Sequence, residues 1–180
     1  MSAPLDLSPS SWVTRFSSLI VPGGTVLDLA AGKGRHARYL AGLGYQVEAV
    51  DRDAEALASL EGFSGIAASK ADLEGEGWPY FGRVFDAVVV TNYLYRPLMP
   101  QILSLLDHGG VLIYETFMVG NERLGKPENP AYLLRKGELL DLVSGRLQVV
   151  AFEQGQVACP RPAVIQRICA TRGDVSSLFI

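Results

Sequence analysis

Strands of buried type alternate with amphipathic helices along most of this chain of 180 residues. Residues 84–90 form the clearest strand, because they are β-branched and almost continuously apolar. The other strands and the helices between them are expected, in chain order, at residues 25–30, 35–43, 45–50, 54–60, 65–69, 97–106 and 111–117. Strands separated by helices pair in parallel, because each helix returns the chain to the edge where the first strand began. The alternation predicts a doubly wound α/β domain with a mostly parallel sheet.

The two ends of the chain depart from this alternation. Residues 147–153 and 163–171 alternate apolar and polar side chains, as antiparallel strands with one solvated face do. We expect them to close one edge of the sheet as a hairpin. Residues 10–20 carry apolar side chains at helical spacing and predict a short helix capped by Ser10. We interpret the chain as one domain with a leader, a cofactor-binding core and a closing segment, at 1–22, 25–117 and 118–180.

Composition limits the classes of function. Hydrophobic residues make up 48% of the chain, enough for a full core, and the net charge of −3 is unlike that of a typical nucleic-acid-binding protein. No apolar stretch reaches the ~18 residues of a membrane span, and the first residues do not resemble a secretory signal. Cys159 and Cys169 lack the spacing of a zinc site. We expect a cytoplasmic monomer or homodimer, without metal or membrane partner, that acts on a small molecule.

A glycine-rich turn follows the first expected strand. Gly32 and Gly34 let a ligand approach the main chain there, with the amide groups of a helix behind it. Asp51 stands at the end of the second strand, where a carboxylate accepts hydrogen bonds from both hydroxyl groups of a ribose. Ligands of open α/β sheets bind beyond the carboxyl ends of the strands. The turn and the carboxylate together predict a nucleoside ligand.

The kind of nucleoside follows from the neighbouring residues. Gly32, Gly34 and Ala37 match the G-x-G-x-x-G/A pattern of a nicotinamide dinucleotide site, so an NAD(P)-dependent oxidoreductase is one alternative. Asp28 lies at the end of the same strand, where a carboxylate opposes a pyrophosphate but suits an ammonium group. A chain of 180 residues also leaves little room for a dehydrogenase's second domain. These observations favour S-adenosyl-L-methionine (S-adenosylmethionine), a phosphate-free, zwitterionic adenosine compound.

Five motifs of the chain resemble class I S-adenosylmethionine-dependent methyltransferases. They are residues 26–36, Asp51, residues 71–73, 85–93 and 106–115, with His108 in place of the usual proline. The resemblance implies a Rossmann-like, seven-stranded sheet in the order 3-2-1-4-5-7-6 with strand seven antiparallel. It also implies these cofactor-binding residues: Asp28, Leu29, Ala30, Ala31, Gly32, Gly34, His36, Asp51, Arg52, Asp72, Leu73, Thr91 and Asn92. Residues 32–36 and 135–140 are similar to small bacterial enzymes of the tellurite-resistance and thiol methyltransferase type.

Substrate residues are expected after the fourth strand and in the first helix. Tyr93 and Tyr95 are placed to pack near a sulfonium through cation–π contact, and Arg96 to hold an anionic substrate. Trp12 and Arg15 are expected in a lid, with Arg15 pairing a cofactor carboxylate. Displacement at a sulfonium needs alignment more than acid–base help, so no catalytic dyad is required. Glu115 is the candidate general base, and Tyr95 is the second catalytic candidate.

The methyl acceptor is not identified by the sequence. Asn92-Tyr-Leu-Tyr95 departs from the Asn/Asp-Pro-Pro-aromatic motif of enzymes that methylate nucleobase amines, which disfavours that acceptor. Alternatives without a catalytic role stay open: Trp12 can pack in the core, Arg96 can be a surface charge, and the whole chain can be a non-catalytic module that binds the cofactor without turnover.

Overall fold

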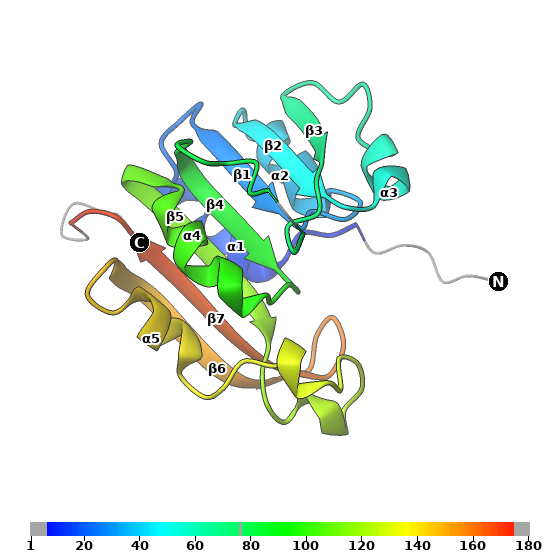
Figure 1. Cartoon of the computed structure of the whole chain (residues 1–180), viewed down its shortest axis with the longest axis vertical. Coiled ribbons are helices and arrows are strands. Elements are labelled where there is room, and N and C mark those ends of the chain that lie inside the picture. Colours follow the sequence, from blue (N-terminus) through cyan, green and yellow to red (C-terminus); the bar gives the residue numbers. More distant parts are fainter. Residues whose placement is uncertain (1–6, 76, 175–180) are drawn as a thin grey trace.

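The computed structural model describes residues 7–75 and 77–174 (Figure 1). The first six residues of the predicted leader and the last six of the predicted closing segment lie outside the described residues. Seven strands form one sheet in the order β3-β2-β1-β4-β5-β7-β6, which confirms the predicted order. Their bounds are β1 Thr25–Leu29, β2 Gln46–Asp51, β3 Ile66–Lys70, β4 Phe85–Thr91, β5 Leu106–Phe117, β6 Gln148–Val157 and β7 Ala163–Thr171.

The register places the reversal of strand order between β1 and β4. Asp28 pairs with Ala49 of β2 on one side and with Val89 of β4 on the other, both in parallel. β7 runs antiparallel to both β5 and β6, as expected of the terminal hairpin. The connections that leave the carboxyl ends of β1 and β4 therefore lead to opposite halves of the sheet, and open α/β sheets bind ligands at such a point.

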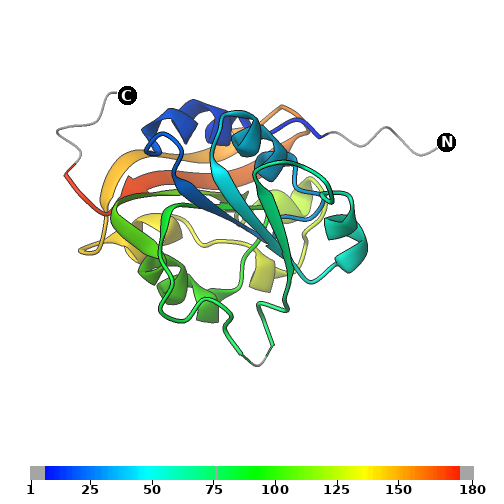
Figure 2. The same ribbon diagram turned by 90° about the horizontal axis from the view of Figure 1, so that it is seen from above.

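Helices cover both faces of the sheet (Figure 2). α1 (Ser11–Phe16) and α2 (Arg35–Gly42) pack with Val26 of β1 on one face, whereas α4 (Met99–Ser104) and α5 (Glu138–Val143) pack with Leu27 and Leu29 on the other. The side chains of a strand alternate between its faces, so β1 contributes to both cores. α3 (Ala54–Ala58) lies beside β2 and β3, and its first amides are capped by Asp53, as predicted.

The short helical turns are η1 Ser17–Leu19, η2 Arg96–Leu98, η3 Asn121–Arg123 and η4 Pro130–Tyr132. The last two lie between β5 and α5, where the polar, Pro- and Gly-rich sequence of residues 119–130 predicts a long loop. This loop folds onto the hairpin: Oδ1 of the buried Asn121 accepts the amide hydrogen of Val164 at 3.1 Å. The sequence prediction was wrong at residues 107–110, which we expected to form a turn before the fifth strand. Leu106 already pairs with Phe85 and Val111 with Ala87, so these residues bulge out of β5.

Candidate active site

Two residues other than glycine adopt left-handed backbone conformations where β1 and β4 end. Ala30 has a φ of 57° and Asn92 a φ of 55°. The backbone stays bonded to the adjacent strand at both places. The amide of Ala31, which follows Ala30, donates to the carbonyl of Val50, and the amide of Asn92 itself donates to the carbonyl of Glu115, each at 2.9 Å. Such conformations cost about 1–3 kcal/mol and persist where the surroundings fix them, commonly at ligand sites. Both residues line one cavity.

The glycine-rich turn is bonded to the carboxylate at the end of β2. Gly32 donates its amide hydrogen to Oδ2 of Asp51 at 2.8 Å, and Asp53 donates its own to Oδ1 at 2.9 Å. Gly32 and Gly34 have φ values of 54° and 69°, which favour glycine. A carboxylate has about four acceptor positions, so each oxygen of Asp51 keeps one for a ligand. The turn thus fixes the carboxylate on the cavity wall.

The cavity at this edge has a volume of about 530 Å³ and an acidic wall. Its charged residues are Asp51, Asp53, Asp72 and Glu74 against the single Arg52, and we call it the acidic cavity. Its lining includes the following predicted site residues: Ala30, Asp51, Arg52, Asp72, Leu73, Asn92 and Tyr93. The structure therefore brings together residues from the ends of β1, β2 and β4 and from the segment after β3.

Tyr93 lines the cavity and carries a buried hydroxyl. This hydroxyl has no hydrogen-bond partner among the described residues, while the carbonyl of Tyr93 accepts from the hydroxyl of Tyr114 at 2.9 Å. Burial, together with the nearby charges of Glu74 and Asp72, raises the pKa of Tyr93, so its hydroxyl stays protonated. A buried donor without a partner costs free energy.

Asp28 lies beneath the glycine-rich turn and not on the cavity wall. It is 1% exposed, and its Oδ2 accepts the amide hydrogen of Ala37 in the first turn of α2 at 3.0 Å. Burial raises the pKa of Asp28 to about 7, although the bond from Ala37 lowers it. Ala37 is the last residue of the dinucleotide-like pattern. Its amide is already bonded to a protein carboxylate, so this helix end is poorly suited to a pyrophosphate.

His36 is buried beside the site as a neutral ring. The amide of Ser10 donates to its Nε2 at 3.2 Å, so the proton stands on Nδ1, which donates to Oγ1 of Thr91 at 3.3 Å. Burial and the charge of Arg35 lower the pKa of His36 to about 3. His36 therefore joins the leader to the end of β4. The cavity lining also leaves out these predicted cofactor residues: Leu29, Ala31, Gly32, Gly34 and Thr91.

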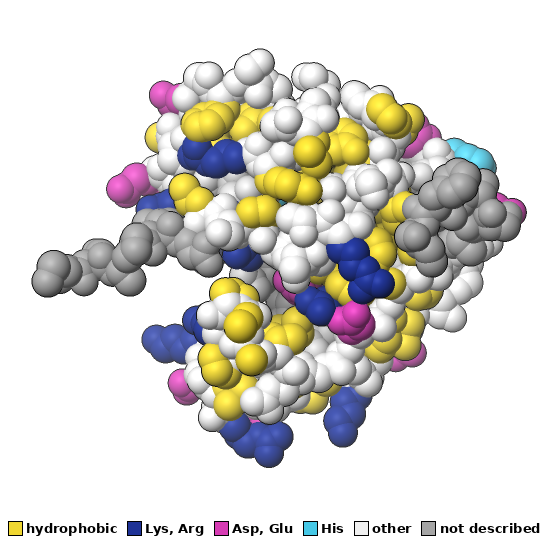
Figure 3. Space-filling view, turned by 180° about the vertical axis from the view of Figure 1, so that it is seen from behind, with side chains coloured by type: hydrophobic (Ala, Val, Ile, Leu, Met, Phe, Trp, Pro, Cys, Tyr) yellow, Lys and Arg dark blue, Asp and Glu magenta, His cyan; other side chains and the backbone are white. Residues whose placement is uncertain are grey.

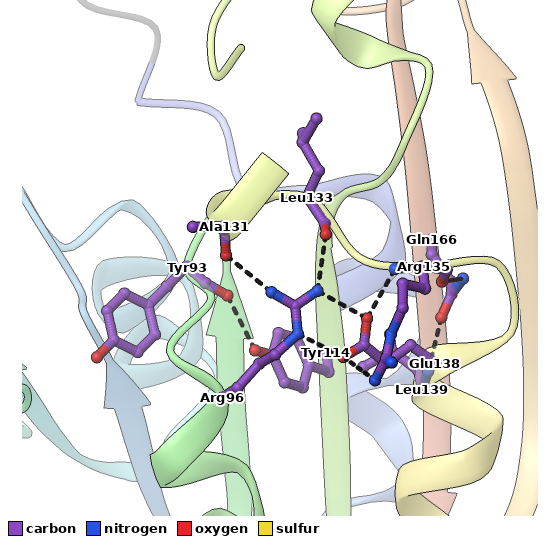
Figure 4. Close-up of polar contacts among 9 residues, drawn as sticks. All are labelled: Tyr93, Arg96, Tyr114, Ala131, Leu133, Arg135, Glu138, Leu139 and Gln166. Atoms are coloured by element: carbon purple, nitrogen blue, oxygen red, sulfur yellow. Dashed lines mark hydrogen bonds and ion pairs between the residues drawn. The ribbon is translucent and has the colours of Figure 1, made fainter. Parts of the chain in front are cut away.

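Arg96 is hydrogen-bonded to several protein groups (Figure 4). Its Nε and Nη2 donate to both carboxylate oxygens of Glu138, at 2.7 and 2.9 Å, and its other bonds reach the carbonyls of Ala131 and Leu133. Burial would raise the pKa of Glu138, but the bonds from Arg96 and Arg135 outweigh it and lower the pKa to about 2. We call these contacts the Arg96 clamp. Four of the five N–H groups of Arg96 are thus bonded to protein groups, and the expected substrate role of Arg96 stays a prediction with one N–H group left for it.

The clamp supports residues of the long loop that the sequence did not indicate. Pro127 and Tyr132 line the acidic cavity opposite the strand ends. The loop's length was the only indication of a functional role. Tyr95 immediately precedes η2 and packs, partly buried, against the core, and it does not line the acidic cavity. A role of Tyr95 at the ligand therefore stays a prediction.

The expected lid residues and the candidate base form a separate cluster. Trp12 is 1% exposed in the core, and Arg15 pairs with Glu153 at 3.3 Å, so the packing role expected as the alternative is the one observed. Glu115 accepts from the hydroxyl of Ser10 at 2.7 Å and pairs with Arg167 at 3.1 Å. Both oxygens of Glu115 thus have partners, and Glu115 lines a neighbouring cavity instead of the acidic one.

This neighbouring cavity, of about 610 Å³, carries three arginines, and we call it the arginine cavity. They are Arg35, Arg161 and Arg167. No pattern in the sequence indicated them as site residues. Asn92 and Phe117 line both cavities, so the two adjoin there.

Two other kinds of site are absent from the described residues. Within residues 7–75 and 77–174, no helix is long and apolar enough to cross a membrane. The same residues contain no group of three or more His, Cys, Asp or Glu side chains placed to hold a metal ion.

Known proteins share this fold and part of this sequence. A protein-L-isoaspartate O-methyltransferase of Chlorobium luteolum is 35% identical over 97 residues, 52% of this chain, and the match spans only 43% of that relative. TehB from Haemophilus influenzae superposes with a TM-score of 0.76 at 18% identity, covering 91% of this chain and 62% of its own. A TehB-like S-adenosylmethionine-dependent methyltransferase from Corynebacterium glutamicum gives 0.65 at 17% identity, covering 89% and 86%.

At these identities the two solved structures establish the fold: a Rossmann-like sheet of the methyltransferase type. The sequence adds the family. The sequence model of the protein family described as "Tellurite resistance protein TehB" matches residues 10–105, which is more than half of the 180 residues. The chain belongs to the family of the tellurite resistance protein TehB.

Proposed function

We propose that this chain binds S-adenosylmethionine in the acidic cavity and transfers its methyl group to a small molecule. The observation that carries the proposal is Asp51. Its carboxylate lines the cavity while amides of Gly32 and Asp53 hold both oxygens, and each oxygen keeps one acceptor position. Two acceptor positions on one fixed carboxylate suit the two neighbouring hydroxyls of a ribose.

Other residues of the cavity suit the rest of an adenosine. Leu73 and Ala71 offer an apolar surface to a purine ring. Four carboxylates against one arginine favour a ligand with cationic groups. A volume of about 530 Å³ is within the range of cofactor sites. These features support the predicted cofactor more than a dinucleotide with two phosphates.

S-Adenosylmethionine supplies a methyl group on a positively charged sulfur, which leaves as a neutral thioether. The bond from carbon to sulfur breaks with its electron pair on sulfur, while a lone pair of the acceptor forms the new bond to carbon. A proton carried by the acceptor atom is lost to solvent or a base. The protein aligns the two reactants at about 3–3.5 Å. Asn92 and Phe117, shared by both cavities, are the residues placed to do so.

Glu115 and Tyr95 stay predictions as catalytic groups, as do the single domain, the cytoplasmic location and the monomer or homodimer. Glu115 borders the junction of the cavities but is paired with Arg167.

The test is calorimetric titration with S-adenosylhomocysteine, the demethylated cofactor. We expect binding by the unaltered chain and a ten- to hundredfold loss in Asp51→Asn, about 1–3 kcal/mol for the missing charged acceptor. Asp107→Asn is the matched control, because it removes the same charge in the bulge of β5 and should keep the affinity within twofold. No binding by the unaltered chain would refute the proposal. Binding without any cofactor turnover would identify a non-catalytic module.

A further inference from the structure

The arginine cavity has an excess of positive charge. Glu115 is the only carboxylate among its described lining residues, and Arg167 is paired with it. Among the described residues, no carboxylate lies within ion-pair distance of Arg35 or Arg161. Arg35 makes one long bond, at 3.4 Å, to the carbonyl of Ser8, and Arg161 lies over the ring of Phe117. Two guanidinium groups are therefore available to an anion in one cavity.

The remaining wall of this cavity is largely apolar. Phe117, Val157 and Ile165 come from the strands β5, β6 and β7, and Pro160 from the turn of the hairpin. A hollow bordered by Lys and Arg side chains is visible on the face shown in Figure 3. An inorganic oxyanion would fill a small part of about 610 Å³ and leave the apolar wall in water. An organic anion with an aryl or alkyl part matches both surfaces.

The cavity meets the proposed cofactor site at its end. Asn92 and Phe117 separate the arginines from the acidic wall. A molecule whose anionic group binds the arginines would present its other end at this junction. That is where the acceptor atom must lie for in-line transfer.

We propose that the arginine cavity binds the methyl acceptor, and that the acceptor is an amphipathic organic anion held by Arg35 and Arg161. The proposal rests on the proposed function, since an acceptor needs a methyl donor beside it. A rival source of the same chemistry is the amino-acid carboxylate of the cofactor, because Arg35 directly follows the glycine-rich turn. The experiment below separates the two sources.

Binding of 3-phenylpropanoate and of the uncharged 3-phenylpropanamide is measured by calorimetry, first on the chain alone and then with saturating S-adenosylhomocysteine. We expect the carboxylate to bind at least tenfold more tightly than the amide. Arg161→Gln and Arg35→Gln should each weaken carboxylate binding about five- to tenfold and leave amide binding unchanged. Arg146→Gln is the matched control, since Arg146 is exposed and lines neither cavity.

Three results would overturn the proposal. Equal affinity for 3-phenylpropanoate and 3-phenylpropanamide would show that the cavity does not select an anion. Displacement of 3-phenylpropanoate by sulfate at comparable concentration would show that the apolar part of the ligand does not contribute. The third is a loss in Arg35→Gln of affinity for S-adenosylhomocysteine but not for 5′-methylthioadenosine, with carboxylate binding unchanged. It would assign the arginines to the cofactor. Since carboxylate binding is measured first without cofactor, its failure is distinct from a failure to bind S-adenosylhomocysteine.

Discussion

The acidic cavity and the arginine cavity adjoin at Asn92 and Phe117 but carry opposite charge. The first has four carboxylates against one arginine, and the second has three arginines against one glutamate. Opposite fields side by side suit a reaction between a cationic donor and an anionic acceptor, because each cavity repels the other's ligand. The difference in charge therefore contributes to placing each proposed reactant in its own cavity.

The two cavities also differ in how the chain builds them. The acidic cavity uses strand ends and the turns that directly follow them, such as Asp51 after β2. The arginine cavity collects the leader at Ser8, the start of α2 at Arg35 and the hairpin at Arg161 and Arg167. One cavity is formed by local sequence and the other by the closing of the sheet.

The largest expected effect comes from removing the Arg96 clamp, which supports one wall of the acidic cavity. Arg96→Met removes the clamp and leaves the carboxylate of Glu138, 8% exposed, with Arg135 as its partner. We expect a loss of roughly 3–4 kcal/mol in the free energy of unfolding, measured by urea denaturation. Binding of S-adenosylhomocysteine should weaken, because Pro127 and Tyr132 lose support. The affinity of the arginine cavity for 3-phenylpropanoate should change less than twofold.

Acid provides the control for this variant. The pKa of Glu138 is lowered to about 2, so its contribution to stability is present above about pH 4.5 and is lost as the pH falls toward 2. The difference between Arg96→Met and the unaltered chain should therefore shrink below pH 4. A difference that stays constant down to pH 3 would mean that the ion pair is not what stabilises this region.

A smaller effect concerns the support that both cavities share. Asp28 fixes the first turn of α2. This turn begins with Arg35, which lines the arginine cavity, and it directly follows the glycine-rich turn at Gly32, which holds Asp51 in the acidic cavity. Because burial raises its pKa to about 7, the ionised form disfavours folding, and stability is lost as the pH rises from about 4 through 7. Asp28→Asn keeps an acceptor for Ala37 and should add about 2–3 kcal/mol at pH 8.

The same variant decides between two roles for Asp28. At pH 4 its stability should equal that of the unaltered chain, since the protonated acid and the amide are then alike in charge. If Asp28 only supports the turn, affinity for S-adenosylhomocysteine at pH 8 should stay within threefold. If it contacts the ligand's ammonium group, as the sequence suggested, affinity should fall at least tenfold.

The sequence predicted the acidic cavity far better than the arginine cavity. Asp51, Asp72 and the turn at Gly32 follow apolar strands directly, so strand order alone brings them together. Arg161 meets Arg35 only after the hairpin has paired with β5, and no local pattern records that contact. The pairing of Arg96 with Glu138 was missed for the same reason, because Glu138 lies 42 residues further along the chain.

The smallest effect tests the junction itself. Asn92 has a φ of 55°, a conformation that glycine adopts freely and a β-branched residue strongly resists. Asn92→Gly should keep stability within about 0.5 kcal/mol, whereas Asn92→Val should lose about 1–2 kcal/mol in thermal or urea unfolding. Both variants remove the amide that borders the two cavities. If that amide aligns the reactants, Asn92→Gly should bind S-adenosylhomocysteine and carboxylate nearly as before, yet turn over an accepted substrate at least tenfold more slowly, because only alignment is lost. Unchanged turnover in Asn92→Gly would leave the junction as a partition between two fields, with the charges on either side responsible for placing the reactants.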